Sequence, residues 1–520
     1  MNGLINPLLH AAMAWRRFTV WPAFTRQLEQ PDERQWDVLR LILQRNRTTR
    51  FGQAHQFAAI QSPADYAARV PLQTYEDLRP YIERQQNGSP AELTRESPRL
   101  FAQTSGTTGQ PKYIPILDRS IADAQANQRL FSFALYRAIP GLFAGKSLGF
   151  VSPAIEGHLP SGTRFGSMSG LINRSQPWLL RQKYVVPAPV FEIPDYEAKY
   201  FTLAAFALAE TNITYMGAAN PSTFIKLAAV IRAQGDALAR ALTSGVLDAR
   251  KRIPPPLERA LQPHFRAQPR RADELRALLA QADSPLFSQL WPRLRALSCW
   301  REGSCRLLLP AVQRLLLPTV PLLELGYLAS EFRGSLPVDP LQHREVPTLH
   351  QNYFEFIERS DWESGRRVIK RLGQLEVGRA YYVVITTPAG LYRYFMNDIV
   401  QVDGFWRATP TLKFVEKGAG VTNLTGEKLY ESQVTAAVSA VLSSPEGAAT
   451  FFVMVAHESE QRYRFYIEAP VSVRHRLQEQ LDLALDAQNL EFKAKRASGR
   501  LGATAVHLLK PGTGETFKTH

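Results

Sequence analysis

Hydrophobic and polar positions follow different periods along the chain, and these periods predict its elements. Residues 1–95 have a mostly helical pattern. Between residues 120 and 330, apolar positions recur at helical spacing in segments such as 196–209 and 221–232, and these segments alternate with short apolar runs such as 147–151. Helices that alternate with strands predict helices layered on a sheet, so we expect an α/β architecture.

The pattern turns to strands in the last third of the chain. Residues 381–394 predict two strands joined by a turn. A glycine-rich break at residues 418–420 is followed by a compact unit with elements of its own: a helix near 429–443, strands near 450–456 and 462–468, a helix near 471–488 and a strand near 504–509. We therefore expect a large N-terminal domain, residues 1–417, and a small C-terminal domain, residues 418–520.

No segment has the pattern of a membrane-spanning or targeting sequence. The most apolar later stretch, residues 307–329, is interrupted by three prolines and carries Arg314 and Glu324, so it predicts core strands and turns instead. Near the start of the chain, the apolar positions come before Arg16 and Arg17, which is the reverse of the order in a signal peptide. We therefore expect no membrane partner.

Composition places the chain among ordinary globular proteins. Its 520 residues are 45% hydrophobic and 21% charged, which excludes a disordered chain and allows two or three domains. The two cysteines, Cys299 and Cys305, have no zinc or redox spacing and are too few for a disulfide framework. We expect both to be small core residues in a reducing compartment, and hence a cytoplasmic protein.

The formal net charge of +15 raises the question of a polyanionic partner. About half of the excess lies in residues 232–306, which hold 14 basic and 7 acidic residues. The arginines there are spaced among leucine and alanine as on the solvated face of a helix. This pattern favours surface helices, and no nucleic-acid motif accompanies it, so a polyanion-binding protein is the weaker alternative and we expect no nucleic-acid partner.

One loop carries the strongest chemical signal: Thr104-Ser105-Gly106-Thr107-Thr108-Gly109-Gln110-Pro111-Lys112. Its glycines let backbone N–H groups face a ligand, its four hydroxyls add donors, and its lysine is a point charge suited to phosphate. Apolar runs on both sides predict that the loop joins two strands. Its G-x-x-G-x-x-K spacing differs from that of the P-loop, which opens a helix. The alternative, an idle polar hairpin, is disfavoured by this density of donors.

This nonapeptide resembles the phosphate-binding signature of the adenylate-forming superfamily, the acyl-CoA synthetases and their relatives. Four further segments resemble the Gretchen Hagen family of acyl-acid amido synthetases and occur in that family's order: residues 48–88, 326–331, 391–400 and 417–429. Each is weak alone, but together they cover most of the chain. The resemblance implies a large N-terminal α/β domain of adenylate-forming type, a small mobile C-terminal α+β domain, and an active site between them.

The resemblance also implies a reaction in two steps. ATP and a small carboxylic acid give an acyl–AMP anhydride and pyrophosphate, and the amine of an amino acid then displaces AMP to leave an amide. ATP and Mg²⁺ are the implied cofactors, the acid and the amino acid are the implied partners, and we expect a monomer or a weak dimer. Two alternatives stay open: an acyl-CoA-type ligase with a thiol acceptor, and a non-catalytic nucleotide-binding protein.

By resemblance, residues outside the loop also take roles in the site. Tyr327 lies against the adenine, and Glu331 supports the magnesium ion as a catalytic residue. Asp398 accepts hydrogen bonds from the ribose hydroxyls, and the residue before it is Asn397, where many relatives have glycine. The ATP-binding set is therefore Thr104, Ser105, Gly106, Thr107, Thr108, Gly109, Lys112, Tyr327, Ser330, Glu331, Asp398 and Lys417.

Four basic residues near these motifs are further candidates. Lys417 lies at the expected interdomain hinge, and Lys428 is a catalytic candidate that enters the site when the small domain rotates. Lys518 only faintly resembles the lysine that adenylate-forming enzymes carry near the C-terminus, so another lysine is the alternative. Arg393 serves either the phosphates or the acid, or is a strand-surface arginine.

The acyl pocket has a weaker signal than the ATP site. By position, Phe165, Tyr215, Met216 and Gly217 line it, because the small residue leaves space and the aromatic rings form walls for an aromatic or alicyclic acid. Ordinary core packing at the ends of strands is an equal alternative.

Overall fold

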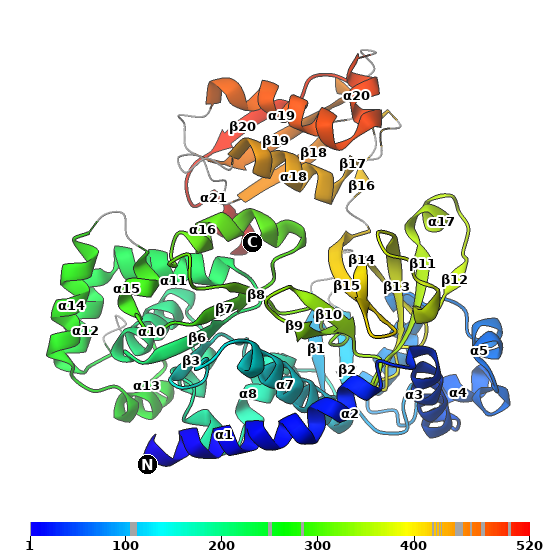
Figure 1. Cartoon of the computed structure of the whole chain (residues 1–520), viewed down its shortest axis with the longest axis horizontal. Helices are drawn as coiled ribbons and strands as arrows, with labels where there is room; N and C mark the ends of the chain where they lie inside the picture. The colour runs from blue at the N-terminus through cyan, green and yellow to red at the C-terminus, as the bar shows by residue number, and fades with distance from the viewer. Residues whose placement is uncertain are drawn as a thin grey trace.

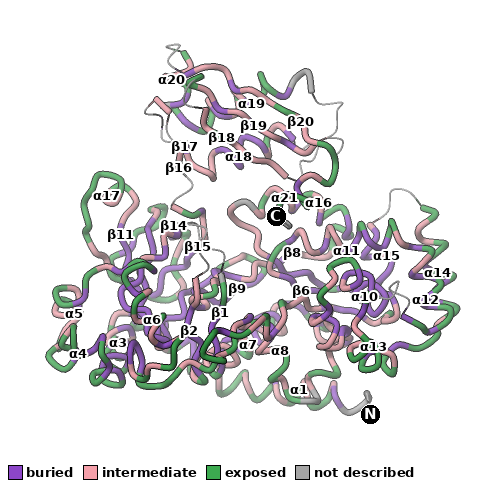
Figure 2. The backbone as a smooth tube through the Cα atoms, turned by 180° about the vertical axis from the view of Figure 1, so that it is seen from behind, coloured by how far each residue is buried: buried purple, intermediate pink, exposed green. Residues whose placement is uncertain are grey.

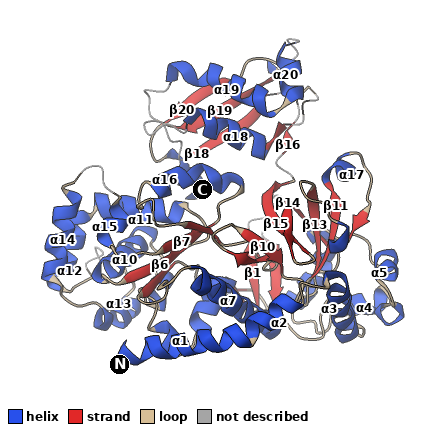
Figure 3. Cartoon of the chain, in the orientation of Figure 1, coloured by secondary structure: helices blue, strands red, loops and turns tan. Residues whose placement is uncertain are grey.

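The residues that the computed structural model describes form three packed regions, each built on β-sheet (Figures 1 and 3). The described residues are 2–104, 112–247, 252–281, 285–418, 421–422, 424–425, 427, 429–442, 451–457, 460–469, 474–497 and 501–519.

The first region begins with helices whose starts are explained by side-chain caps. Ser62 accepts the N–H of Asp65 at 3.0 Å at the start of α5, and the Asp77 carboxylate accepts the N–H and the hydroxyl of Thr74 at the start of α6. The helical elements are α1 (Asn2–Phe18), α2 (Val20–Arg26), α3 (Pro31–Asn46), α4 (Arg50–Ala54), η1 (Phe57–Ala59), α5 (Pro63–Arg69), α6 (Tyr75–Gln86) and α7 (Asp118–Ala138).

Two antiparallel sheets and one mixed sheet, in which β1 and β5 pair in parallel, complete this region and share its hydrophobic core with the helices. The largest has the order β12-β11-β13-β14-β15, from β11 (Tyr353–Glu358), β12 (Ile369–Lys370), β13 (Ala380–Thr386), β14 (Tyr394–Trp406) and β15 (Thr409–Lys417). Helices α17 (Arg359–Glu363) and η5 (Leu372–Gln374) connect its strands. The smaller sheets contain β1 (Leu100–Thr104), β2 (Lys112–Ile116), β4 (Gly157–His158), β5 (Arg164–Gly166), β9 (Ser335–Asp339) and β10 (Arg344–Pro347).

The second region is a parallel sheet covered by helices, with the order β3 (Lys146–Gly149), β6 (Ile213–Gly217), β7 (Ala296–Cys299) and β8 (Leu322–Glu324). Parallel sheets are normally buried, with helices covering their faces. Figure 2 shows β6 and α10 largely buried. Its helices are α8 (Met168–Ser175), α9 (Trp178–Arg181), η2 (Ala188–Glu192), α10 (Tyr196–Ala209), α11 (Ser222–Ala233), α12 (Gly235–Ser244), α13 (Pro255–Leu261), η3 (Gln262–His264), α14 (Pro269–Leu279), α15 (Leu286–Leu290), η4 (Gly303–Leu308) and α16 (Leu309–Gln313).

The third region is the C-terminal unit, which has a sheet and a hydrophobic core of its own. Its elements are β16 (Val421–Thr422), β17 (Leu429–Tyr430), α18 (Glu431–Leu442), β18 (Phe451–His457), β19 (Arg462–Glu468), α19 (Arg474–Gln488), α20 (Leu490–Ala497), β20 (Ala505–Leu509) and α21 (Thr513–Thr519). The last helix reaches back to the second region, where Lys226 of α11 pairs with Glu515 at 2.9 Å.

The predicted α/β class, with a large N-terminal part and a smaller C-terminal unit, is confirmed. The proposed boundary at residue 417 stays a prediction. Cys299 is fully buried in β7, as expected, whereas Cys305 is only partly buried. The expectation of strands and turns over residues 307–329 is wrong for residues 307–313, which belong to η4 and α16, and is confirmed for residues 314–329, where turns and irregular chain flank the strand Leu322–Glu324. No helix in the described ranges is long and apolar enough to cross a membrane.

Arg393 is a structural residue of the first region. Its Nε donates to the Glu355 carboxylate at 2.9 Å, and its Nη1 donates to the carbonyl oxygens of Ala67 and Val70 at 3.0 and 2.7 Å. The arginine and glutamate side chains are 5% and 3% exposed. The sequence-based roles for Arg393, in phosphate or acid binding or on a strand surface, are therefore replaced by a buried ion pair that ties the chain before Gln73 to the central sheet.

We expect Arg393→Met to lower the free energy of unfolding by about 3–5 kcal/mol, because it leaves the buried Glu355 carboxylate uncompensated. Urea denaturation measures this loss. Arg276→Gln is the matched control, because Arg276 pairs with Asp273 at 2.7 Å on the exposed surface, where a pair contributes about 0–1 kcal/mol. Equal effects of the two substitutions would contradict a structural role for the buried pair.

Candidate active site

A cavity of about 580 Å³ opens where the parallel sheet meets α7 and the loop that follows β8. Its lining includes residues directly after the carboxyl ends of all four parallel strands: Phe150, Ala218, Trp300 and Leu325. Open α/β sheets bind ligands at this edge, and the volume lies in the range of small-molecule sites. The fold therefore positions a small-molecule site here.

Three residues to which the sequence analysis gave ATP-binding roles contact one another beside this cavity. The Tyr327 hydroxyl donates to Asp398 Oδ2 at 2.6 Å, and Lys417 Nζ donates to Asp398 Oδ1 at 3.1 Å. Asp398 is buried, whereas Lys417 is exposed. The antiparallel register of β14 and β15 sets Asp398 opposite Lys417, so backbone pairing brings the lysine to the carboxylate.

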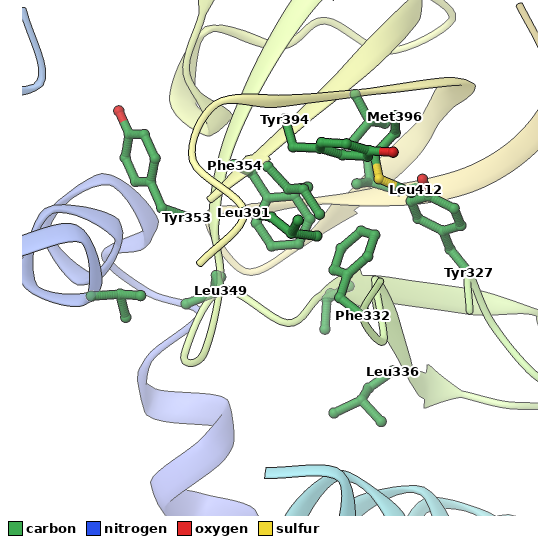
Figure 4. Packing of buried hydrophobic residues seen from close by; sticks show 14 of the residues in the cluster. Tyr327, Phe332, Leu336, Leu349, Tyr353, Phe354, Leu391, Tyr394, Met396 and Leu412 are labelled. Atoms are coloured by element: carbon green, nitrogen blue, oxygen red, sulfur yellow. The ribbon is translucent and has the colours of Figure 1, made fainter. Parts of the chain in front are cut away.

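The loop between β8 and β9 supplies Tyr327 to this cluster. Its ring lies 5.9 Å from the Phe414 ring at an interplanar angle of 24°, and 5.3 Å from the Phe332 ring, edge to face. Figure 4 shows Tyr327 and Phe332 extending from this loop toward the strand that carries Tyr394 and Met396. Burial, reinforced by the Asp398 charge, raises the pKa of Tyr327 well above its ordinary value, so the hydroxyl stays protonated as a donor.

Glu331 faces the cavity four residues after Tyr327. Burial raises the pKa of its carboxyl, and the Asp398 charge raises it further, whereas Lys417 and Lys112 act in the opposite direction. The side chain of Glu331 therefore shares one electrostatic site with Asp398 and with Lys112, which begins β2. Ser330 is exposed and also lines the cavity.

Asn397, the residue before Asp398, has a left-handed backbone conformation. Its φ of 54° lies in the left-handed region, which asparagine tolerates better than most residues. Its carbonyl accepts the N–H of Gly418 at 2.7 Å. A Cβ at Gly418 would lie 2.2 Å from the Tyr382 ring, so the first residue after β15 needs to be glycine for steric reasons.

Several predicted residues lie outside the described part of the chain. The backbone of Thr104 pairs with that of Lys112 across β1 and β2, as the strand–loop–strand prediction requires. Residues between them, Ser105, Gly106, Thr107, Thr108 and Gly109, lie outside the described residues, as do Lys428 and the side chains of Thr104 and Lys518. Their roles stay predictions.

The four residues assigned to the acyl pocket separate into two groups. Tyr215 and Gly217 line the cavity. Met216 lies between them on β6, and its fully buried side chain belongs to the core on the other face, because side chains alternate along a strand. Phe165 packs edge to face on Tyr113, with ring centroids 5.7 Å apart, and its neighbour Gly166 lines the cavity instead.

The largest group of lining residues that the sequence analysis missed comes from one face of α7. Their spacing of three or four residues is the period of a helix, so it was visible in the sequence, but nothing marked this helix as the one beside the ligand. Trp300, Tyr184 and Arg333 were also missed. The α7 residues in the lining are Ser120, Asp123, Ala124, Asn127, Gln128 and Phe131.

The C-terminal unit is joined to the end of β15 by a polar cluster on the other side of the strand from Asp398. Arg359 donates from Nη2 to Glu416 and from Nε to Glu363, both at 2.9 Å, and its guanidinium lies 3.7 Å from the centre of the Tyr430 ring. Glu416 accepts the N–H of Ser432 at 2.7 Å. These contacts hold the start of α18 against the central sheet.

Solved structures share this architecture. The GH3.15 acyl acid amido synthetase superposes with a TM-score of 0.86 at 23% identity, covering 96% of this chain and 90% of that one. A 2-hydroxyisobutyryl-CoA ligase, solved with its acyl–AMP in the postadenylation state, superposes with a TM-score of 0.54 at 15% identity, covering 92% and 85%. The fold is thus that of the adenylate-forming ligases.

Sequence comparison identifies the family to which the chain belongs. Models described as the GH3 family N-terminal, central and C-terminal domains match residues 22–322, 346–417 and 431–520, and the chain therefore belongs to the GH3 family. Similar proteins include indole-3-acetic acid-amido synthetases GH3.3 and GH3.15 of Arabidopsis thaliana, which are 26% and 27% identical to it, each match covering 77% of this chain and 70% of the relative. The resemblance to the Gretchen Hagen amido synthetases, and with it the ligase class, is confirmed.

We expect Arg359→Gln to loosen the C-terminal unit. Arg359 contacts the C-terminal unit through the Tyr430 ring, and losing this contact of about 0.5–2 kcal/mol raises the population of the separated form about twofold to thirtyfold. Limited proteolysis within residues 418–430 follows this population. Arg366→Gln is the control, because Arg366 pairs with Asp361 at 2.6 Å nearby but makes no contact with the C-terminal unit among the described residues. Equal cleavage of both variants would contradict the prediction.

Proposed function

We propose that this protein is an ATP-dependent acyl-acid amido synthetase that adenylates a small carboxylic acid and transfers the acyl group to an amino acid. The observation that carries the proposal is the meeting of Tyr327, Asp398 and Lys417 beside an aromatic-walled cavity in a GH3 chain. The polar cluster suits a nucleotide, and the cavity suits an acyl group. We also propose that the protein acts in the cytoplasm, as a monomer or a weak dimer, without a nucleic-acid or membrane partner.

In the first step, a carboxylate oxygen of the acid attacks the α-phosphorus of ATP and pyrophosphate leaves. Asp398, held by Tyr327 and Lys417, accepts hydrogen bonds from the ribose hydroxyls, and the Tyr327 ring lies against the adenine. The phosphates lie at the loop of Thr104, Ser105, Gly106, Thr107, Thr108 and Gly109, with Lys112 at its end. Donors directed at developing charge are the usual main contribution in phosphoryl transfer.

Glu331 fits the role of a protein ligand for Mg²⁺. Magnesium takes oxygen ligands and commonly uses only one or two carboxylates, together with water and phosphate oxygens. Glu331 is an acidic residue of the cavity that lies in the electrostatic range of both Asp398 and Lys112. Glu331 would hold the ion, which would neutralise charge on the phosphates.

In the second step, the amine of an amino acid, after losing its ammonium proton, attacks the acyl carbon and AMP leaves. We propose that the C-terminal unit reorients about residues 416–420 between the steps and that Lys428 then enters the site. The contacts of Arg359 with Tyr430 and of Glu416 with Ser432 belong to the orientation described above and are exchanged in that motion. Closure keeps water from the anhydride.

A thiol acceptor is the second candidate, and the observation behind it is the fold shared with the CoA ligase. Family membership favours the amine acceptor. A non-catalytic nucleotide-binding protein is the third candidate, and it differs from both in forming no AMP.

Mass-spectrometric product analysis tests the proposal directly. We expect purified protein with Mg–ATP, pooled carboxylic acids and pooled amino acids to form AMP and a new amide that is absent without the amino acids. AMP without an amide would favour the thiol acceptor, and coenzyme A then replaces the amino acids in the assay. No AMP with any acid would contradict adenylation.

We expect Glu331→Gln to lower magnesium-dependent AMP formation about 100-fold or more, since it removes the proposed ligand charge while keeping the shape of the side chain. Glu83→Gln is the control, because Glu83 is an exposed glutamate that pairs with Arg79 at 4.0 Å and lies outside the cavity lining. Full activity of the Glu331 variant, measured over a range of Mg²⁺ concentrations, would refute the metal assignment.

We expect Asp398→Ala to weaken ATP binding about tenfold to hundredfold, because it removes a charged acceptor, and to weaken the binding of the acid less, since it affects the acid only through the loop that carries Tyr327. Isothermal titration with ATP measures this effect. Asp403→Ala is the control on the same strand, since Asp403 accepts a hydrogen bond from Thr411 away from the cavity. An unchanged ATP affinity in the Asp398 variant would rule out the ribose role.

A further inference from the structure

The charges that line the cavity are unfavourable for the substrate that it is proposed to bind. A carboxylic acid is an anion at neutral pH, yet the lining contains the acidic residues Asp123, Glu156 and Glu331. Among the described lining residues, Arg333 is the only basic one. Residues 105–111, which are outside the described part, contain no lysine, arginine or histidine. Arg119 pairs with Asp123 at 3.5 Å, and Lys417 and Lys112 act on Glu331 from outside the lining, so Arg333 is the one cation among the described lining residues that can contact a bound anion.

Hydrogen bonds to backbone atoms hold the Arg333 guanidinium in place. Its Nη2 donates to the Leu325 carbonyl at 2.6 Å, and its Nε donates to the Ser335 carbonyl at 3.1 Å. The guanidinium lies 4.8 Å from the centre of the Phe131 ring, on the face of α7 that lines the cavity. An arginine fixed in this way needs little ordering when it binds a ligand.

Arg333 keeps donor capacity and charge for a ligand. Its Nη1 donates to no described residue, and no described carboxylate lies within 4.0 Å of the guanidinium. Burial lowers the pKa of Arg333 to about 10, so it stays protonated at neutral pH. A partly buried guanidinium without a carboxylate partner is unusual, because desolvated charges in proteins are normally paired.

Two glutamates near Arg333 are already committed to other groups. Glu345 accepts the Ser335 hydroxyl at 2.5 Å, and Glu324 accepts the backbone N–H groups of Arg301, Leu325 and Gly326. Burial raises the pKa of both carboxyls, so the pair carries less than its full negative charge near neutral pH. These two glutamates therefore offset the positive charge of Arg333 only in part.

We propose that Arg333 binds the carboxylate of the acid substrate and so makes the cavity selective for acids over uncharged molecules of the same shape. The free Nη1 and the remaining Nη2 proton donate to the carboxylate oxygens, and the aromatic walls at Phe131 and Tyr215 contact the acyl group. The inference rests on the proposed function, because it assigns this cavity to the acyl group.

Binding of matched acids and amides tests the proposal without requiring turnover. The probes are indole-3-acetate, benzoate and cyclohexanecarboxylate, each compared with its amide by isothermal titration on the full chain. In the unmodified protein we expect at least one acid to bind about tenfold to hundredfold more tightly than its amide, the difference for hydrogen bonds to charged groups. Arg333→Gln should abolish this preference and change the amide affinity less than about twofold.

Two further variants separate charge from folding. Arg333→Lys keeps the charge but loses the planar donor fork, so it should retain part of the preference. Arg137→Gln removes an arginine that also lies 4.7 Å from an aromatic ring centre, that of Trp21, and donates to a carbonyl, but it lies outside the cavity lining and should behave as the unmodified protein. Thermal melting verifies that all variants are folded.

The proposal is overturned if no acid is bound, if acid and amide bind equally in the unmodified protein, or if Arg333→Gln keeps the preference. AMP formation decides the proposed function separately. AMP formation with an unchanged preference in Arg333→Gln refutes only the role of Arg333. A preference that depends on Arg333 without AMP formation supports the carboxylate site and refutes the synthetase.

Discussion

The carboxylate of Asp398 joins the parts of the chain that make the site. Through the Tyr327 hydroxyl it is linked to the loop that leaves the parallel sheet, and through Lys417 to the last residue of β15. Because Asp398 is buried, the cost of leaving it without partners is large, and this cost fixes how the two sheets meet. The cavity at the edge of the parallel sheet depends on that meeting, since one of its walls is the loop that carries Tyr327.

Strand β15 extends this constraint to the C-terminal unit. Lys417 faces Asp398, whereas its neighbour Glu416 contacts Arg359 and the N–H of Ser432. Adjacent side chains on a strand point to opposite faces, so one residue serves the proposed nucleotide site and the next holds the start of α18. A rotation of the backbone just after β15 therefore changes the contacts of the C-terminal unit without requiring the Asp398 cluster to break.

The sequence-based predictions of helices were correct where the capping residues and the apolar pattern agreed with the tertiary packing. The expected helix at residues 196–209 coincides with α10, because Asp195 caps its start and most of its residues are apolar. The helix at residues 309–313 was missed because Pro310 was interpreted as a break, although proline is favoured in the first turn of a helix. The helix α20 was missed as well, even though Asn489 accepts the Phe492 N–H at 2.8 Å as an N-cap. The sequence motifs identified Tyr327, Asp398 and Lys417, which the structure brings together. The acyl residues were assigned without regard to the alternation of side chains along a strand, which places Tyr215 and Met216 on opposite faces of β6.

The net charge of the sequence does not indicate which basic residue lies in the site. About half of the excess of 15 positive charges lies in residues 232–306, and water and salt screen an exposed charge within about 10 Å. Arg333 is one of 62 lysine and arginine residues in the chain. It lies beside Phe131 in a partly desolvated cavity, where an electrostatic interaction is several times stronger than in water. Its significance follows from the absence of a carboxylate within 4.0 Å among the described residues, which is a property of the three-dimensional arrangement. No motif or spacing in the sequence distinguishes this arginine from those on the surface.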